Sequence, residues 1–410
     1  MSIDIIITEN PANGRTMSFI ENITAKVDGV FSWTIEAFGG FATAHFEMVV
    51  PEADAWTMLN RIGKRIAFLS PDAPDKSLIC WEGMISNVNV DDGGASIGRS
   101  LDNCYNRVRV NFTRINATTS EVEGQDGTDD HNDLDSQALY GKRSLRYVTG
   151  NTTRTLADSL ADIFLSQYAN PRATATTLRR GGGAGASSTR VTVDCVGFSQ
   201  ELATHFHEET SISTATIDGI LSAIVSGTGY GNSGTYQRLD FVDRTDTTHI
   251  AANTTTVTRY NLTEKTTRTY IDELMRYGDG ATGRRTFYGY YENRKFYYTV
   301  EGSTYDYITL RNDPSEAITD RVTGAIVPPW LVRPGKIIGV PDLLPEETSV
   351  DPYFENPRAF CIGTVEFTAP ATVVLTPVPP DPSGLWGTVV GYAPTSLDVT
   401  PLPPIPGGGP

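Results

Sequence analysis

The chain is short of basic side chains and of long apolar runs. Its 410 residues include 33 Lys and Arg against 49 Asp and Glu, which gives a formal net charge of −16. Binding DNA through a basic surface requires Lys and Arg that neutralise phosphates, so this balance argues against such a surface. No run of about 18 apolar residues occurs, and the first residues lack the basic and apolar regions of a signal peptide. We therefore expect a soluble chain without a membrane-spanning segment and without a signal for export.

Cysteine is also scarce. Cys80, Cys104, Cys195 and Cys361 lie far apart in apolar, strand-like runs. The sequence has no CxxC pair and no Cys/His spacing of the kind that binds zinc. We expect four buried, reduced thiols and neither a disulfide framework nor a metal site.

A block with a glycine turn followed by a strand occurs twice. Arg61-Ile-Gly-Lys-Arg-Ile-Ala-Phe, followed by Cys80-Trp-Glu-Gly-Met-Ile, returns as Arg333-Pro-Gly-Lys-Ile-Ile-Gly-Val, followed by Cys361-Ile-Gly-Thr-Val. In each copy a polar loop and a second glycine-containing strand follow. This duplication predicts one small β-barrel used twice. Two quasi-equivalent surfaces in one subunit would let a ring present twice its own symmetry to a neighbour.

Hydrophobic periodicity assigns the secondary structure. Between Ser32 and Phe112 the apolar residues alternate, with Ala44, Phe46 and Met48 on one face, which is typical of half-buried strands. Helical spacing predicts a stripe of Leu156, Leu160, Ile163 and Phe164 after a cap at Thr152 or Thr153, and a stripe of Ile217, Ile220, Leu221 and Ile224 in a later helix. Short helices are also predicted at 52–61, 199–208 and 269–278, and an aromatic hairpin at 285–300.

Changes in composition divide the chain. Residues 113–135 are rich in Thr, Asp, Glu and Gly and are interpreted as a surface loop or domain boundary. We predict a β-rich α+β fold with five segments: a first β-barrel domain at 1–116, an acidic loop and helical insert at 117–190, a mixed α/β segment at 191–265, a second β-barrel domain at 266–376 and a Pro-rich C-terminal arm at 377–410.

Three segments could in principle bind ligands, and each also has a simpler structural explanation. The glycine-rich run at 181–187 lacks the lysine of a phosphate-binding loop, so it is interpreted as a linker. The acids at 126–135 do not follow the spacing of a calcium loop; we favour a solvated acidic loop and leave a bound cation open. His205 and His207, beside Glu208 and Glu209, are two positions apart and would face different sides of a helix, unlike the histidines of a zinc helix.

Candidate acid pairs and tyrosines are weighed in the same way. Asp91 with Asp92, or Asp272 with Glu273, would suit a glycosidase only if the two carboxyls converged across a cleft, and adjacent acids usually diverge. Tyrosines of the predicted hairpin could stack on sugars or bases, but aromatic pairs across strands commonly stabilise a sheet or an interface. These tyrosines are Tyr288, Tyr290, Tyr291, Tyr297 and Tyr298. We therefore predict no catalytic, cofactor-binding or metal-binding residue and no enzymatic activity.

In this order the segments resemble the hub proteins at the distal end of bacteriophage tails, the family of contractile-tail baseplate hubs and of the base of type VI secretion spikes. The resemblance covers most of residues 1–376. It rests on Ser32-Trp-Thr-Ile-Glu-Ala-Phe-Gly-Gly-Phe, Trp81-Glu-Gly-Met-Ile, Asn106-Arg-Val-Arg-Val, the helical insertion ending in Tyr168-Ala-Asn-Pro, the Phe287-Tyr-Gly-Tyr-Tyr hairpin, and Arg333-Pro-Gly with Phe360-Cys-Ile-Gly-Thr-Val.

The resemblance implies a structural virion protein made in the host cytoplasm. In such a hub, three chains would each give two tail-tube-like barrels, so a homotrimer would match a sixfold tail tube or distal tail protein above and a threefold tip, spike or fibre protein below. DNA and the tape-measure protein would pass through its lumen, and an acidic lining would keep DNA from adhering.

The Pro-rich arm carries the predicted partner-binding residues. Pro-rich sequence favours extended polyproline geometry without a core of its own. The apolar residues within it that we expect to dock on a neighbouring tip or fibre protein are Leu385, Trp386, Val389, Val390 and Tyr392. Some hub relatives carry a hydrolase after the hub region, and we expect none here. The alternative function is a carbohydrate-binding or glycan-cleaving virion protein that recognises the host.

Overall fold

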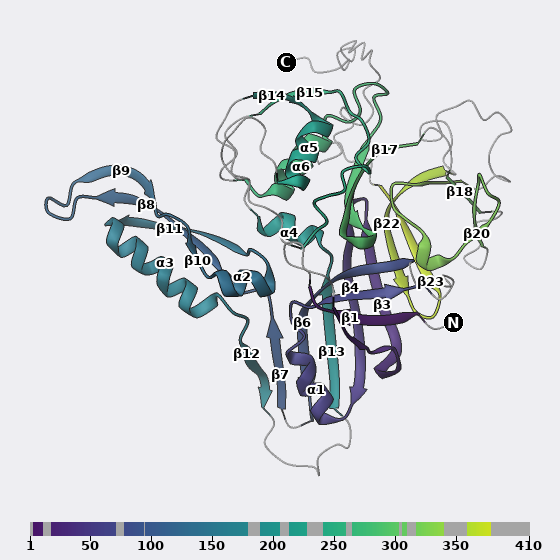
Figure 1. Cartoon of the computed structure of the whole chain (residues 1–410), viewed down its shortest axis with the longest axis horizontal. Helices are drawn as coiled ribbons and strands as arrows, with labels where there is room; N and C mark the ends of the chain where they lie inside the picture. The colour runs from purple at the N-terminus through teal and green to yellow at the C-terminus, as the bar shows by residue number, and fades with distance from the viewer. Residues whose placement is uncertain are drawn as a thin grey trace, which may run out of the picture.

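Strands outnumber helices in the described part of the chain, as the alternating patterns predict. The computed structural model describes residues 3–10, 18–70, 78–93, 95–178, 189–205, 213–227, 241–259, 265–302, 306–309, 317–339 and 359–378. Among these residues, 17 strands are linked in one large sheet, and two smaller sheets contain four and two strands. Six α-helices and three 3-10 helices (η) lie around them (Figure 1). The expected β-rich α+β class is confirmed.

The first half of the chain contributes nine strands of the large sheet. They are β1 Asp4–Thr8, β2 Phe19–Asn22, β3 Val27–Glu36, β4 Phe38–Val50, β5 Arg65–Leu69, β6 Ile79–Asp91, β7 Ala95–Ser100, β12 Ala173–Leu178 and β13 Thr189–Val196. The short helix η1 Thr24–Lys26 links β2 to β3, and α1 Glu52–Leu59 follows β4 within the predicted range 52–61. In β4 the predicted face is buried, at Ala44, Phe46 and Met48.

The second half of the chain completes the same sheet. Its strands are β16 Thr286–Tyr291, β17 Lys295–Val300, β18 Tyr307–Ile308, β19 Ile318–Asp320, β20 Ile326–Val327, β21 Ile337–Gly339, β22 Ala359–Thr368 and β23 Thr372–Pro377, with η2 Glu292–Arg294 between β16 and β17 and η3 Pro329–Leu331 before β21. The two halves share one core, in which the ring of Trp33 stacks on that of Phe367 with centroids 4.3 Å apart. No helix in the described segments is long and apolar enough to cross a membrane.

Strand β4 is the centre of this arrangement. β13 pairs with β4 along one edge and with β6 on its far side, while β3 pairs with the other edge of β4 and with β22. β6 continues to β5, and β22 continues to β21. The strand order is therefore β5-β6-β13-β4-β3-β22-β21. The repeated block contributes β5 and β6 at one end of this order and β22 and β21 at the other end, with β4 in the middle.

The repeated blocks have the same local geometry. Gly63 and Gly335 take φ values of 80° and 77°, in the left-handed region that favours glycine. Gly63 N–H donates to the Ile85 carbonyl at 2.9 Å, and Ile85 N–H donates to the Lys64 carbonyl at 3.0 Å. In the second copy, Gly335 N–H donates to the carbonyl of Ile362 at 2.7 Å, and the N–H of this isoleucine donates to the Lys336 carbonyl at 2.9 Å.

This shared hydrogen-bond pattern corrects the sequence alignment of the second strands. The sequence aligns Cys80 with Cys361, but the ladders place Met84 opposite Arg65 and Cys361 opposite Ile337, so Met84 is the counterpart of Cys361. The glycines of the two strands, Gly83 and Gly363, are not equivalent and contact different neighbours. A Cβ on Gly83 would lie 2.3 Å from the Val196 carbonyl oxygen, whereas one on Gly363 would meet the backbone of Val378 at 2.8 Å.

Two closed barrels stay a prediction. Among the described strands, successive pairings lead from β2 through β1, β5, β6, β13 and β4 to β3, but no pairing joins β2 to β3. β8, which the sequence assigns to the first barrel, pairs with β9, β10 and β11 instead. Period-two patterning identifies a strand but not its partner, so β8 could not be excluded from the main sheet by its sequence.

Residues 105–169 project from the main sheet (Figure 1). They are called the arm below and are distinct from the predicted Pro-rich C-terminal arm. The elements of the arm are β8 Arg107–Ile115, β9 Val122–Gly127, β10 His131–Asn132, α2 Leu134–Tyr140, β11 Ser144–Thr152 and α3 Arg154–Tyr168. The interpretation of 113–135 as a surface loop is wrong, because β8 and β9 pair there as a hairpin. β9 escaped detection since its side chains are largely exposed and polar, without an apolar face.

Helix α3 is capped as predicted, because the Thr153 hydroxyl accepts a hydrogen bond from Leu156 N–H. The predicted stripe is confirmed in part, because Leu160 and Phe164 are partly buried against the core that includes β8. Ala157 and Ala161 lie against β8, whereas Leu156 and Ile163 are exposed. The small alanines let the helix approach the sheet closely, so Leu156 and Ile163, which flank them in sequence, are left at the edge.

A second core lies between the helices and the aromatic hairpin. The elements around it are α4 Ser199–Thr204, β14 Ser213–Thr216, α5 Ile217–Ser226, β15 Thr256–Arg259 and α6 Thr267–Met275, together with β16 and β17. The predicted stripe of α5 is buried, and α6 is followed by Gly278 with a φ of 58°. Helix α4 ends at Thr204, short of the predicted 208.

The repeated turns predict a graded response to substitution. Gly63→Ala combines positive-φ strain with a Cβ only 2.7 Å from the Tyr140 ring, whereas Gly335→Ala adds a Cβ 3.2 Å from Phe287. We expect losses in the free energy of unfolding of about 3 and about 2 kcal/mol. The control Gly93→Ala has a φ of 82° but open space around it, and should cost about 1 kcal/mol. Urea unfolding measures all three, and equal losses would contradict a packing role for the two turns.

Candidate functional site

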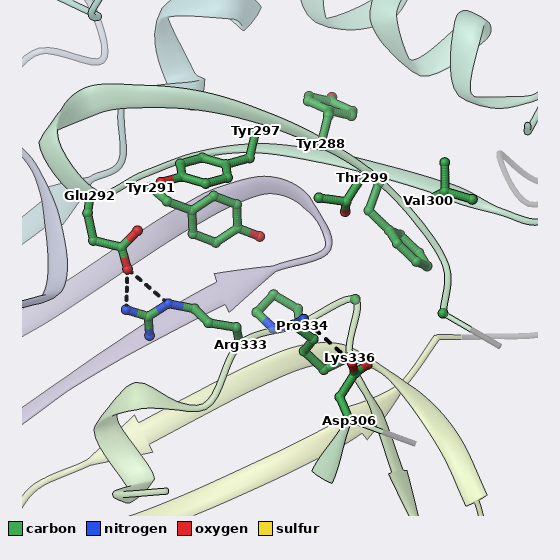
Figure 2. Close-up of a pocket in the computed structure, with 13 residues that line it drawn as sticks. Tyr288, Tyr291, Glu292, Tyr297, Thr299, Val300, Asp306, Arg333, Pro334 and Lys336 are labelled. Atoms are coloured by element: carbon green, nitrogen blue, oxygen red, sulfur yellow. Dashed lines mark hydrogen bonds and ion pairs between the residues drawn. The ribbon is translucent and has the colours of Figure 1, made fainter. Parts of the chain in front are cut away.

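A pocket of about 330 Å³ lies between the aromatic hairpin and the second repeated turn (Figure 2). Strands β16 and β17 supply one side, and residues 333–336 supply the opposite side. Thr299 and Asp306 complete its rim. The pocket therefore joins two features that the sequence singles out separately, the tyrosine hairpin and the Arg-x-Gly-Lys block.

Strand alternation decides which tyrosines reach the pocket. Tyr288 pairs across the hairpin with Tyr298, and Tyr290 pairs with Phe296; these side chains are buried in the second core. The remaining two tyrosines, Tyr291 and Tyr297, point to the other face and are partly exposed in the pocket, whereas Tyr288 borders the pocket with only 1% of its surface exposed. The prediction that cross-strand aromatic pairs stabilise the sheet is thus confirmed for three of the five tyrosines.

Tyr291 and Tyr297 form an aromatic wall. Their ring centroids are 5.5 Å apart at an angle of 87°, and the far side of Tyr297 stacks on His249 at 4.3 Å. The hydroxyl of Tyr291 points into the pocket (Figure 2). Burial raises the pKa of Tyr291, so this phenol stays protonated at neutral pH and can donate a hydrogen bond.

Arg333 anchors the opposite side of the pocket. Its Nη2 and Nε donate to Glu292 Oε1 at 2.6 and 3.2 Å, and Nη2 also donates to the Ile79 carbonyl at 3.1 Å. The guanidinium lies 5.4 Å from the centre of the Phe41 ring. Arg333 therefore ties the second repeated turn both to the hairpin and to β6 of the first copy.

Lys336 and Asp306 close the lower rim. The Lys336 ammonium lies 3.6 Å from Asp306 Oδ1, while the other oxygen of this carboxylate accepts from Ile337 N–H at 3.1 Å. Half of the Lys336 side chain remains exposed, so its charge is accessible to a ligand. Sequence reasoning found Arg333 and Lys336 as signs of duplication but did not recognise them as pocket residues.

The first repeated block makes corresponding ion pairs with different surroundings. Lys64 pairs with Glu9, and Arg61 lies 3.6 Å from Glu21. A cavity of about 270 Å³ beside Arg61 is lined by Lys26, Asp54 and other polar or aliphatic side chains, and none of its lining residues is aromatic. The aromatic wall therefore distinguishes the pocket of the second copy from this cavity.

The candidate acid pairs do not converge. Asp272 accepts a hydrogen bond from the Tyr288 hydroxyl at 2.5 Å, and burial raises its pKa, while Glu273 pairs with Lys265 at 2.7 Å. Asp91 and Asp92 accept hydrogen bonds from backbone N–H groups of the turn between β6 and β7. These carboxylates are used locally in turns, ion pairs and the core.

The acids at 126–135 are neutralised by arginines. Arg154 lies 3.1 Å from Asp129, 3.3 Å from Asp158 and 4.0 Å from Asp126, and Arg107 pairs with Asp130 at 2.5 Å. Asp133 instead caps α2 by accepting from Ser136 N–H. Within the described segments, no group of three or more potential metal ligands comes together.

His205 is a buried residue at the end of α4. Its Nε2 lies 4.0 Å from Glu201 Oε1, and burial, with smaller effects of Lys142 and Arg107, lowers its pKa from 6.5 to about 3. Its predicted companions His207, Glu208 and Glu209 lie outside the described residues. The same holds for the glycine-rich run at 181–187 and for the partner-binding residues of the Pro-rich arm, Leu385, Trp386, Val389, Val390 and Tyr392. All four cysteines are buried and free, as expected.

Comparisons with known proteins find a distant structural similarity and no sequence relative. No protein-family model matches the chain, and no curated protein matches it. Among solved structures, the crystal structure of the prophage MuSo2 43 kDa tail protein from Shewanella oneidensis is similar over 93% of this chain and 98% of that chain, with 10% sequence identity and a TM-score of 0.31. A similarity at this level carries no argument about function.

The contacts of Arg333 predict its contribution to stability. Arg333→Met should lower the free energy of unfolding by about 2 to 3 kcal/mol, because it removes charge-assisted hydrogen bonds and a cation–π contact. Glu292→Gln should cost about 1 kcal/mol, and a double-mutant cycle should give a coupling of at least about 1 kcal/mol. As a control, Arg190 is 61% exposed and pairs with Glu47, so Arg190→Met should change stability by less than about 0.5 kcal/mol. Additive effects at Arg333 and Glu292 would contradict the account.

Burial of His205 predicts an acid-sensitive core. Because its folded-state pKa is lowered, the unfolded chain binds a proton below about pH 6.5 that the folded chain does not bind until about pH 3, so stability falls as pH falls through this window. Between pH 7 and pH 5 the loss from this residue should be about 2 kcal/mol. His205→Phe should remove that part of the pH dependence in urea unfolding. Parallel pH curves for the two proteins would show that His205 titrates normally.

Proposed function

We propose that the chain is a structural subunit of a bacteriophage tail tip or baseplate, a trimeric hub that adapts a sixfold tail tube to a threefold tip. One observation carries the proposal. Two copies of the same turn-and-strand unit, with matching backbone hydrogen bonds at Gly63 and Gly335, lie on opposite sides of β4. A chain built in this way has two quasi-equivalent surfaces, so a ring of three chains offers six.

The arm and the helical core fit the threefold side of such an adaptor. They arise from segments between and around the repeated blocks, and each occurs once in the described chain: the arm at residues 105–169 and the second core around α5 and α6. In a trimer these elements would repeat three times while the turn-and-strand units repeat six times. The tail-tube or distal tail protein would bind the sixfold side, and a spike, tip or fibre protein would bind the threefold side.

The charge of the chain supports its use as a DNA conduit. Three chains would carry three times the net charge of −16, and acidic side chains facing a lumen would repel the phosphates of passing DNA. The proposed location is the virion, with synthesis in the cytoplasm of the bacterial host. A structural and non-enzymatic role agrees with the local use of the candidate acids and of His205 in caps, ion pairs and the core.

The alternative is a glycan-binding virion protein, and fewer tyrosines are available to stack on sugars than the sequence suggests. Of the three hairpin tyrosines that line the pocket, Tyr288 is 1% exposed and hydrogen-bonded to Asp272, which leaves Tyr291 and Tyr297 partly exposed there. The acid pairs proposed for cleavage do not converge. This alternative predicts a monomer that binds host glycans.

Light scattering of the purified full-length chain separates the two functions. The hub proposal predicts a mass of about 134 kDa, three times 44.6 kDa, that holds over a tenfold dilution. Binding to purified host-surface glycans, measured on the same sample, should be absent. A monomer of 44.6 kDa that binds these glycans would refute the proposal.

A further inference from the structure

Exposed apolar side chains gather on the arm. The described residues include sixteen exposed large apolar side chains, and eight of them lie in the arm. The eight are Val122, Leu134, Leu139, Tyr147, Val148, Leu156, Ile163 and Tyr168. Exposed apolar residues need no explanation when they are scattered singly, but contiguous ones mark interaction sites. The arm is therefore a candidate interaction surface.

The contacts of α3 identify its two flanks. His131 of β10 contacts Asp158 and Asp162, with its Nδ1 2.7 Å from Asp162 Oδ1, so these acids lie on the β10 flank. On the other flank the ring of Phe164 packs on the ring of Tyr147 from β11, with centroids 5.0 Å apart. The side of α3 that carries Phe164 is therefore the side next to β11.

An exposed apolar stripe follows the β11 flank of α3. Leu160 and Leu156 precede Phe164 at helical spacing, and Ile163 follows Leu160 at the same kind of spacing, so all of them lie on the β11 side. Leu156 and Ile163 are 63% and 50% exposed, and Tyr147 below them is 40% exposed. The stripe therefore borders the outer edge of β11.

β11 is an edge strand among the described strands. It pairs in parallel with β8 over residues 144–148, before the register shifts between Val148 and Asn151, and no other described strand pairs with it. Its outer edge presents backbone N–H and C=O groups that one added strand would satisfy. An extended segment of five residues, about 17 Å long, matches the regular part of this edge.

The opposite face of the same edge favours negative charge in a partner. Leu145 packs into the core beneath α3, so its neighbour Arg146 faces away from the helix. The strand register places Arg146 directly opposite Arg109 of β8, and like charges at opposite positions repel. An acidic residue on a strand added beside Arg146 would offset this repulsion, whereas a basic residue would increase it.

We propose that the outer edge of β11 binds an extended segment of another protein, in which apolar residues alternate with acidic ones. The backbone of the segment extends the β8–β11 ladder, its apolar side chains pack against the stripe on α3, and an acidic side chain lies beside Arg146. In this mode of recognition, main-chain hydrogen bonds give affinity and the alternate side chains give specificity. The inference concerns the arm alone and does not depend on the proposed hub function.

Binding of a labelled peptide to the full-length chain tests the proposal. The probe is a fluorescein-labelled peptide in which four valines alternate with three glutamates, and fluorescence anisotropy should show saturable binding below about 1 mM. Two control peptides should bind at least about tenfold more weakly: one with lysine in place of glutamate, and one of the same composition with the valines in one block. Absence of saturable binding, or equal binding of the control peptides, would overturn the proposal.

Substitutions on the two faces of the edge identify the contacts. Arg146→Glu should invert the charge preference, so that the lysine peptide binds more tightly than the glutamate peptide. Leu156→Ser combined with Ile163→Ser should weaken binding of the glutamate peptide at least about fivefold, because apolar contact is lost. The control Leu134→Ser changes a side chain that is 72% exposed on α2 and should leave binding unchanged. Circular dichroism verifies the fold of each variant, and unaltered binding by the folded Leu156 and Ile163 variant would overturn the proposal.

Hydrogen exchange locates the bound peptide. Saturating glutamate peptide should slow amide exchange within residues 144–148, because an added strand protects the outer edge of β11. Protection confined to other segments would overturn the proposal. Protection of residues 144–148 in the chain alone that is lost on dilution would also overturn it, because a second copy would then be the occupant.

Discussion

The architecture depends on the pairing of one long strand, β4, along both of its edges. β13 and β3 are far apart in sequence, yet each forms a long antiparallel ladder with β4. At its start β4 also accepts β16 in parallel, where a Cβ on Gly40 or Gly289 would collide with the opposite backbone at 2.3 Å. Because β4 joins both repeated units and the aromatic hairpin, a slip of its register would displace all of them. The two duplicated units therefore share one hydrophobic core and are not two independently packed domains.

Local signals in the sequence predict much of this fold. The cap at Thr153, the stripe of α5, the glycine after α6 and both glycine turns follow from chemistry within a few residues, and the structure confirms them. Long-range pairing is different. The alternating pattern of β13 does not indicate that this strand inserts between β4 and β6. The polar strand β9 pairs through its backbone, and its acidic side chains form ion pairs with arginines on β8 and α3.

The candidate site shows the same division. Alternation along the hairpin predicts that its tyrosines divide between two faces, but which face is open depends on the second core, whose helices are distant in sequence. The role of Arg333 was hidden for a related reason, since its partners lie at Ile79, Glu292 and Phe41. The two repeated blocks thus share a backbone but differ in surroundings: Tyr140 covers the first turn, whereas Phe287 and the tyrosine wall border the second. In the proposed hub, this difference would let a threefold partner distinguish the two units.

Electron cryo-microscopy of the purified protein, reconstructed without imposed symmetry, tests the quasi-equivalence of the two units most directly. The account predicts a ring of three chains in which six turn-and-strand units, built alternately around Gly63 and Gly335, lie at one level around a central channel, with three arms outside this sixfold layer. A particle in which the two units of a chain lie at different levels, or in which only one of them takes part in the ring, would contradict it.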